Sequence, residues 1–203
     1  ITILDHHQTA EKNLRPLLDA GVVQGEFDQQ RSGAGMAWDW CFPGQPRPAL
    51  LNYIEDRDLW RHALPDSRAV SLALRVYPLD FEIWDGLMEA VETLRTEGKI
   101  ILRYNDQRLA ELKPQARRAM IGGHNVPVIN APAYLASDLA HQLAQGEAFA
   151  AVYFDAPDGR HISLRSTPGG LDVSLVAESY GGGGHRHAAG FRAPLPPLLS
   201  VAE

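Results

Sequence analysis

Cysteine, long apolar runs and basic charge are all scarce in this sequence. The single cysteine, Cys41, excludes an intrachain disulfide, and no stretch approaches the roughly 18 apolar residues of a membrane-spanning helix. Lys and Arg number 19 against 25 Asp and Glu, for a formal net charge of -6. This balance argues against a broad grip on a nucleic-acid backbone, which needs many basic side chains. The sequence therefore predicts a protein of a reducing, cytoplasmic compartment with no membrane partner.

The first residues, Ile1 to Leu4, include no initiator Met and no signal-peptide pattern. They are apolar or β-branched, and they run directly into Asp5-His6-His7. This pattern is typical of a buried parallel strand whose carboxyl end presents polar groups, the place where open α/β sheets put their chemistry. Because such a strand needs neighbours, we expect further strands of the same sheet upstream.

Helices and strands alternate in the first part of the chain. Thr9 is expected to cap a helix that Gly21 ends, and residues 22–27 follow as a strand. Ser32 is expected to cap a second helix, and residues 49–60 form a third. This alternation is typical of an α/β fold.

The rest of the chain is predicted to hold a long helical segment and a smaller mixed domain. Apolar residues recur at threes and fours over residues 81–119, which predicts helix. A strand, a helix and a hairpin are expected next, at residues 126–129, 134–143, 150–154 and 161–165. We therefore predict an α/β fold in three parts: the distal part of a catalytic domain with a partial parallel sheet at residues 1–97, a helical connector at 98–114, and a smaller α/β substrate-binding domain at 115–203.

The tripeptide Asp5-His6-His7 is the first candidate metal-binding group. A carboxylate and two imidazoles at the end of a strand suit Mn, Zn or Fe better than Mg alone. The alternative is a chance tripeptide in a loop or at a helix start, and the tripeptide by itself does not decide between the two.

The acidic segment Glu55-Asp56-Arg57-Asp58 is the second candidate. Three carboxylates within one helical turn repel one another unless a positive charge lies nearby. On a solvated helix face, Arg57 and Arg61 would provide that charge. In the functional alternative, Asp56 points at a metal that the histidine pair also holds. Both interpretations stay open at the level of local sequence.

Four consecutive glycines, Gly181 to Gly184, precede His185-Arg186-His187. Such a run loses much conformational entropy on folding, which is tolerated where the backbone adopts positive φ or approaches another group closely. A ligand phosphate is the expected group, because N–H groups of a Gly-rich turn form an anion-binding nest and His185 and Arg186 add donors. The alternative is a flexible linker, but such linkers are usually Gly/Ser mixtures, and strand-like residues follow here.

Arg165 ends the second strand of the expected hairpin. It is expected either to face the same pocket and grip a phosphate or a base, or to be a solvated arginine at a strand end. The isolated His62, His124, His141 and His161 have no partner at metal-ligand spacing, so we expect them to have surface or structural roles.

In their order along the chain, these motifs resemble those of the DHH phosphoesterase superfamily, in its branch with a C-terminal DHH-associated domain. That branch includes nanoRNases, cyclic-dinucleotide phosphodiesterases, phosphoadenosine-phosphate phosphatases and single-strand exonucleases. The resemblance covers nearly the whole chain. The motifs that carry it are Asp5-His6-His7, Ser32-Gly33-Ala34, Asp56-Arg57-Asp58-Leu59-Trp60, Gly182-Gly183-Gly184-His185 and Ala188-Ala189-Gly190-Phe191.

The resemblance implies a metal-dependent phosphohydrolase with a divalent metal cofactor, most commonly Mn. It implies that His6 is a metal ligand and Asp56 its carboxylate partner, with Asp58 as the alternative if the alignment shifts by two residues. His7 is then a donor to the scissile phosphate, and Asp5 orients it. The partner implied is a small phosphorylated nucleotide or short oligonucleotide, and a homodimer is allowed. The implied substrate-binding residues are Gly182, Gly183, Gly184, His185, Arg186 and Arg165.

The family's upstream His-x-Asp-x-Asp motif and its next aspartate belong before Asp5, and only four residues precede Asp5 here. We therefore expect this chain alone to hold no stable dinuclear centre and to turn over little or no substrate. Two other functions stay open: a non-catalytic nucleotide- or phosphate-binding module, and a relative of inorganic pyrophosphatases or polyphosphatases. The second ranks lower, because the pyrophosphatases of the superfamily have a different C-terminal domain without Gly-Gly-Gly-His.

Overall fold

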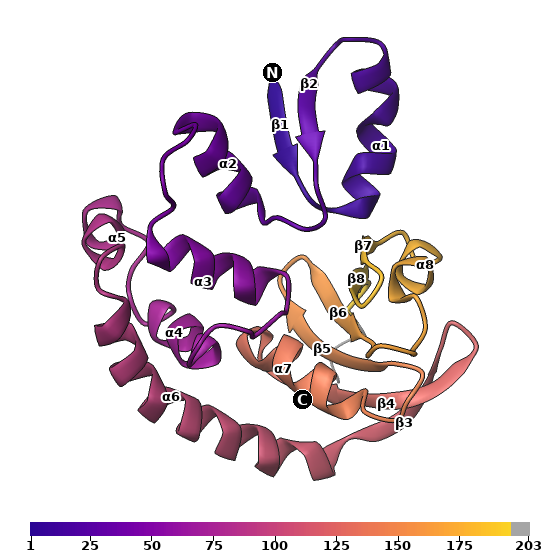
Figure 1. Ribbon diagram of the computed structural model, residues 1–203. Helices are drawn as coiled ribbons and strands as arrows, with labels where there is room; N and C mark the ends of the chain where they lie inside the picture. Colours follow the sequence, from indigo (N-terminus) through magenta and orange to yellow (C-terminus); the bar gives the residue numbers. More distant parts are fainter. Residues whose placement is uncertain (196–203) are drawn as a thin grey trace. The chain divides into compact units, whose positions relative to one another are not determined.

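The computed structural model describes residues 1–195 and shows an α/β protein, which confirms the predicted fold class (Figure 1). The chain divides into two compact units, Ile1–Gln107 and Arg108–Glu203. A parallel pair of strands belongs to the first unit and a mixed six-stranded sheet to the second. The last residues of the predicted third part, 196–203, lie outside the described residues.

The first unit begins with a strand–helix–strand segment. Strand β1 (Thr2–Asp5) pairs in parallel with β2 (Gln24–Phe27), and α1 (Gln8–Asp19) connects them. Because Asp5 is the partner of Phe27, the two strands end at the same edge of the sheet. Five helices follow along the chain: α2 (Gly33–Cys41), α3 (Ala49–Asp58), α4 (Ser67–Leu74), α5 (Phe81–Leu87) and α6 (Val91–Leu112).

The buried core of this unit lies among the helices α3 to α6 and not beneath the strands. Its members are Leu50, Val70, Ala73, Leu87, Val91 and Leu94. In contrast, α1 has no buried residue, and every residue of β1 is half-buried or exposed. The prediction of a parallel strand is confirmed, but its predicted burial is wrong over residues 1–195, because β2 is the one strand that pairs with β1 there.

The predicted helix caps are right at one helix and wrong at another. The hydroxyl of Ser32 accepts a hydrogen bond from the Gly35 N–H at 3.1 Å, which confirms it as the cap of α2. Thr9 is not a cap, because α1 already begins at Gln8 and His7 occupies the N-cap position. Gly21 lies just past the end of α1 with φ +68°, the conformation that favours glycine.

The stretch predicted as helical over residues 81–119 is interrupted twice. Helix α5 ends at Leu87, α6 runs from Val91 to Leu112, and a short 3₁₀ turn with Pro114 follows. The prediction is wrong for the last residues, which form β3 (Arg117–Ile121). Pro114 cannot continue an α-helix, and the residues after it pair with a neighbouring strand.

The second unit is built on a six-stranded sheet in the order β3-β4-β5-β6-β8-β7. Strands β4 and β5 are parallel neighbours, joined through α7 (Ala133–Leu143), and the other pairs are antiparallel. The β5–β6 pair confirms the predicted hairpin. The strands not yet bounded are β4 (His124–Asn130), β5 (Ala150–Ala156), β6 (Gly159–Arg165), β7 (Gly183–His185) and β8 (Ala188–Ala193).

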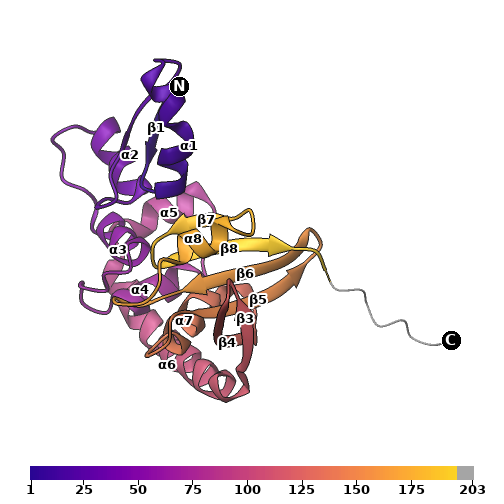
Figure 2. The ribbon, with the colours of Figure 1, turned by 90° about the vertical axis from the view of Figure 1, so that its right-hand side faces the viewer.

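Apolar side chains cover both faces of this sheet. On one face, Val152 packs with Leu139 of α7 and with Leu109 from the last turn of α6. On the other face, Ala151 packs with residues of α8 (Val173–Glu178) such as Ala177. Figure 2 shows α8 beside β7 and β8, and α7 packs on β5 and β6. None of the helices formed by residues 1–195 combines the length and apolar character that a membrane crossing requires.

Gly98 permits the close approach of α6 to α4. A Cβ at this position would lie 2.0 Å from the carbonyl oxygen of Ala69, and backbone cannot move aside easily. We expect Gly98→Ala to lower the free energy of unfolding by about 1–3 kcal/mol through this overlap. Gly86→Ala in α5 is the matched control, because its Cβ would meet no atom within 4 Å. Urea denaturation of both variants checks this, and equal stabilities would contradict it.

Candidate functional site

The carboxylate of Asp5 organises the end of β1. Its Oδ1 accepts the backbone N–H of His6 at 2.7 Å and of His7 at 3.3 Å, and it lies 2.7 Å from the His7 Nδ1. Burial raises the pKa of Asp5, but the hydrogen bonds from the His7 ring and from both N–H groups lower it more, so the net pKa lies below its ordinary value. An ionised Asp5 keeps the proton of His7 on Nδ1 and leaves Nε2 to face other groups.

His6 is buried beside this pair, with 5% of its surface exposed. Its Nε2 lies 3.3 Å from Oδ2 of Asp58, whose side chain is 46% exposed at the end of α3. The rings of His6 and His7 meet edge to face, with centroids 4.5 Å apart. The first unit thus brings two imidazoles and two carboxylates together, from the end of β1 and the last turn of α3.

Asp56 is turned toward the loop that follows α3. It is 4% exposed, and its carboxylate accepts the backbone N–H of Ala63 at 2.9 Å and of Leu64 at 3.4 Å. In the same loop, Trp60 and His62 have φ of +56° and +49°, which is uncommon for residues other than glycine. The structure therefore brings Asp58, the alternative in the sequence, next to His6, and gives Asp56 the contacts of a loop anchor.

Glu55 belongs to a buried network that the sequence did not reveal. Glu55 is 9% exposed, and its carboxylate accepts the Ser32 N–H at 2.9 Å and an Arg47 N–H at 3.1 Å. Gly35 makes room for this network, because a Cβ there would lie 2.4 Å from Glu55 Oε2. Arg47 also pairs with Asp39 at 2.5 Å, which lowers the pKa of that carboxyl. No periodic spacing in the sequence links Arg47, in a proline-rich segment, to these acids.

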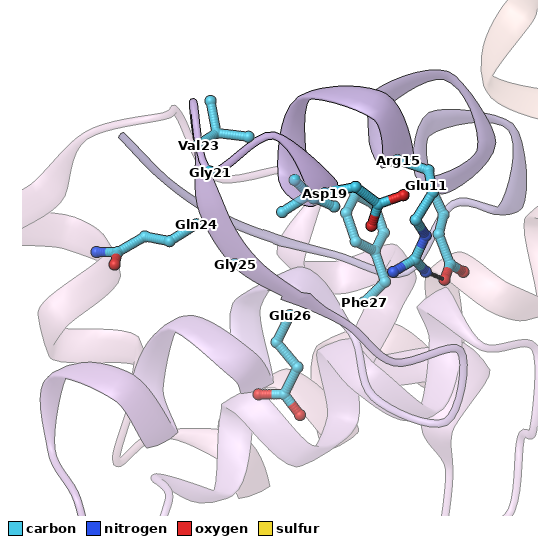
Figure 3. Close-up of a pocket in the computed structure, with 10 residues that line it drawn as sticks. Glu11, Arg15, Asp19, Gly21, Val23, Gln24, Gly25, Glu26 and Phe27 are labelled. Atoms are coloured by element: carbon cyan, nitrogen blue, oxygen red, sulfur yellow. Dashed lines mark hydrogen bonds and ion pairs between the residues drawn. The ribbon is translucent and has the colours of Figure 1, made fainter.

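A cavity of about 720 Å³ lies between α1 and β2 (Figure 3). Glu11 and Arg15 form an ion pair on its α1 side, with Asp19 one turn further along the helix. Leu18 and Phe27 supply apolar lining. None of the residues predicted for catalysis or metal binding lines this cavity, so it is not the candidate site.

In the second unit, two of the four glycines have a purely structural explanation. A Cβ on Gly182 would lie 2.1 Å from the carbonyl oxygen of Gly190, and one on Gly184 would lie 2.5 Å from that of Ala188. Gly184 also has φ of +144°. These glycines let β7 run close beside β8. The glycine run was expected to permit the close approach of a ligand, but at these two positions it permits the close approach of a neighbouring strand. The linker interpretation is wrong, since Gly183 and Gly184 are strand residues.

The predicted Arg165 and His185 lie in one row across the sheet. Both are strand partners of Ala188, in β6 and β7 respectively, so their side chains emerge on the same face. Arg165 donates to the hydroxyl of Ser137 on α7 at 2.8 Å. Arg186, in the turn after His185, lies 3.5 Å from Asp172.

Ser166 and His187 complete this end of the sheet, and no spacing along the chain indicated their pairing. The Ser166 hydroxyl lies 2.8 Å from His187 Nδ1, and the Ser166 N–H donates to the His187 carbonyl at 3.2 Å. The carbonyl of Arg186 accepts the N–H of Val173 at the start of α8 at 2.8 Å. The turn that holds the predicted ligand-binding residues is thereby tied to β6 and to α8.

Among known proteins, this chain has a relative by sequence but no matching family model. No protein-family model matches the chain. The uncharacterized protein R106 of Acanthamoeba polyphaga mimivirus is 30% identical over 199 residues, which is 93% of this chain and 46% of the viral protein. This chain thus spans less than half the length of that relative.

The solved structures that are weakly similar to this chain include the following two. An uncharacterized protein from Helicobacter pylori G27 has a TM-score of 0.32 and 12% identity, over 95% of this chain and 77% of the other. The pGpG-specific phosphodiesterase PggH from Vibrio cholerae has a TM-score of 0.45 and 9% identity, over 85% and 73%. Likenesses at this level assign neither a family nor an activity to this chain.

The hydrogen bond between His7 and Asp5 is testable through the pKa of Asp5. In His7→Ala the ring hydrogen bond is lost, so we expect the Asp5 pKa to rise toward its ordinary value of 3.8. Since the folded-state pKa is depressed, the stability that Asp5 contributes is present above about pH 4 and is lost as the pH falls through the folded-state pKa. Carboxyl-carbon NMR titration measures the shift. Gln8→Ala, next along the chain, is the control, and a pKa that does not move in His7→Ala would contradict the assignment.

Proposed function

We propose that this chain is part of a metal-dependent phosphohydrolase of the DHH type, which acts on small phosphoesters such as short oligonucleotides, cyclic dinucleotides or nucleotide phosphates. The observation that carries the proposal is the placement of buried His6 3.3 Å from Asp58, beside the Asp5–His7 pair, at the carboxyl end of a parallel strand. This is the edge at which open α/β sheets hold their reactive groups.

The donor set at this edge fits a divalent transition metal. An imidazole nitrogen and a carboxylate oxygen suit Mn²⁺ or Zn²⁺, and His6 and Asp58 would hold the ion. When bound, the metal supplies a Lewis acid and a water that ionises near neutral pH. Further ligands of a two-metal centre are proposed to come from a part of the protein outside this chain.

His7 and Asp5 support a second role in the same site. Asp5 accepts from His7 Nδ1 and fixes the plane of the ring. When His7 is protonated, the adjacent carboxylate stabilises the imidazolium and Nε2–H can donate to a phosphate oxygen. His7 is therefore the proposed donor to the scissile phosphate, and Asp5 positions it.

The second unit is proposed to grip the phosphorylated ligand. Arg165 and His185 emerge on one face of the sheet, and Arg186 follows in the turn. Cationic and imidazole donors of this kind form charge-assisted hydrogen bonds with phosphate. Because these residues lie within a unit that has its own sheet and core, a non-catalytic nucleotide-binding module is the second candidate function.

Asp58 and Asp56 are expected to respond differently to amide substitution. Asp58→Asn removes the carboxylate beside His6, so we expect Mn²⁺ affinity of the full-length protein to fall at least about tenfold with little change in thermal stability. Asp56→Asn weakens the anchor of the loop, and we expect a loss of about 1–3 kcal/mol in stability. Isothermal titration with Mn²⁺ and thermal unfolding measure both. Loss of Mn²⁺ binding in Asp56→Asn alone would instead favour the pairing of His6 with Asp56.

Hydrolysis itself is tested on the full-length protein with Mn²⁺ and short oligonucleotides as substrates. We expect His6→Ala to lower kcat by roughly 100-fold or more, since the ion and its bound water are lost together. His141→Ala, a histidine of α7, is the matched control. Full activity in His6→Ala would rule out the metal role. Nucleotide binding without hydrolysis in the wild-type protein, lost in His185→Ala, would favour the binding module.

A further inference from the structure

A second cavity, of about 490 Å³, lies on the sheet of the second unit. Residues of three neighbouring strands line it: Phe154 of β5, His161 and Ser163 of β6, and Gly190 and Arg192 of β8. Its volume lies within the range of roughly 300–1,000 Å³ that small-ligand sites occupy.

Strand register places the cavity on the same face of the sheet as Arg165 and His185. Partners in adjacent strands point to the same side, and every second residue of a strand does so too. Three cross-strand rows follow on this face: Phe154, His161 and Arg192; Val152, Ser163, Gly190 and Gly183; Ala150, Arg165, Ala188 and His185. Because Gly190 and Gly183 have no side chains, the sheet surface is lower along the middle row. On one side of it lies the row with the aromatic rings, and on the other the row with the candidate phosphate-binding residues.

The aromatic row presents flat surfaces. The rings of Phe154 and His161 stack with centroids 5.0 Å apart and an interplanar angle of 10°. Asp158 contacts two side chains of this row: it lies 2.8 Å from His161 Nε2 and 3.0 Å from Arg192 Nη1. The Arg192 side chain is 66% exposed, so a ligand in the cavity can reach it.

The middle row supplies a polar group that no neighbour uses. Ser163 lines the cavity and is half-buried, and its hydroxyl makes no hydrogen bond with any of residues 1–195. A pocket with an aromatic wall, one hydrogen-bonding hydroxyl and a planar guanidinium has the chemistry of base recognition, in which stacking gives affinity and a few polar groups orient the ring. A cross-strand pair that merely stabilises the sheet would need neither the cavity nor the exposed arginine.

We propose that this cavity binds a nucleobase of the ligand, with His161 and Phe154 as the stacking surface and Ser163 and Arg192 as polar contacts. The proposal deepens the function proposed above, because it takes its ligand class from it. His161 lies four positions before Arg165 along β6, about 13 Å at the rise of a strand. A linear ligand with its phosphate at the Arg165–His185 row then places a base in the cavity, which favours short oligonucleotides over isolated phosphate esters.

The test uses binding by the whole chain, in EDTA so that no hydrolysis intervenes, with the 5′-phosphorylated adenosine dinucleotide pApA as the probe. We expect upfield shifts of the His161 imidazole protons in NMR, which ring stacking produces and a purely structural role does not. We also expect His161→Ala to weaken pApA binding by roughly tenfold or more and Ser163→Ala by about threefold to tenfold. His141→Ala is the control and should bind as the wild type does.

Each outcome decides the matter. Unmoved His161 resonances at saturating pApA, wild-type affinity in both His161→Ala and Ser163→Ala, or no pApA binding at all would overturn the base pocket. Ser163→Ala removes one atom from a half-buried position, so it stays informative if His161→Ala fails to fold. Weaker binding in His185→Ala with no effect of His161→Ala overturns this pocket and leaves the proposed function standing. If pApA shifts the His161 resonances but the full-length protein hydrolyses no substrate, the pocket is supported and the proposed hydrolase function is overturned.

Discussion

The buried carboxylate of Glu55 fixes where the last turn of α3 lies. It accepts the N–H of Ser32, which follows β2, so the end of α3 is tied to the chain leaving the parallel strand pair. Arg47 balances the buried charge, and this matters because an unpaired carboxylate in such a place destabilises a protein by several kcal/mol. The contact between Asp58 and His6 depends on this anchor, since the two residues belong to elements about fifty positions apart.

Two carboxylates near the candidate site, Asp5 and Asp56, bind mainly backbone N–H groups. Asp5 accepts two N–H groups at the start of α1, and Asp56 accepts two in the loop after α3. The bonds to Asp5 lower its pKa, and each bond fixes backbone near a histidine or an aspartate of the site. The rigidity of the site thus comes from side chains that do not themselves need to touch a metal.

In the second unit the constraint is strand register. The pairing of β6 and β7 with the two edges of β8 determines the face of the sheet on which the side chains lie. Arg165 and His185 share one face, and His161 and Arg192 lie on that same face. Gly182 and Gly184 permit that pairing, because any side chain there would overlap the neighbouring backbone. The surface proposed to bind a phosphate and a base is then a consequence of the two hydrogen-bond ladders along β8.

Much of the local structure was predictable from the sequence, because the signals are short-range. The strand before Asp5, the Ser32 cap and the β5–β6 hairpin rest on neighbouring residues and are confirmed. The predicted end of the helical connector at residue 114 agrees with the end of α6 and the turn at Pro114, but the strand β3 was missed, because helical periodicity runs on past the residue at which it begins. The burial of β1 was also predicted wrongly. Apolar residues favour burial, but they do not show whether a neighbouring strand or helix is present to cover them.

By itself, the sequence determined which chemical groups are available: an imidazole pair beside a carboxylate, an acidic helix end, and a glycine run followed by histidines. Only the tertiary structure decided their pairing. Asp58 meets His6 and Asp56 holds a loop because two residues make a little over half a turn of helix, so the two carboxylates point in different directions. Similarly, the ring of His161 stacks on Phe154 of the adjacent strand, because contacts across a sheet depend on register and leave no trace in spacing along the chain.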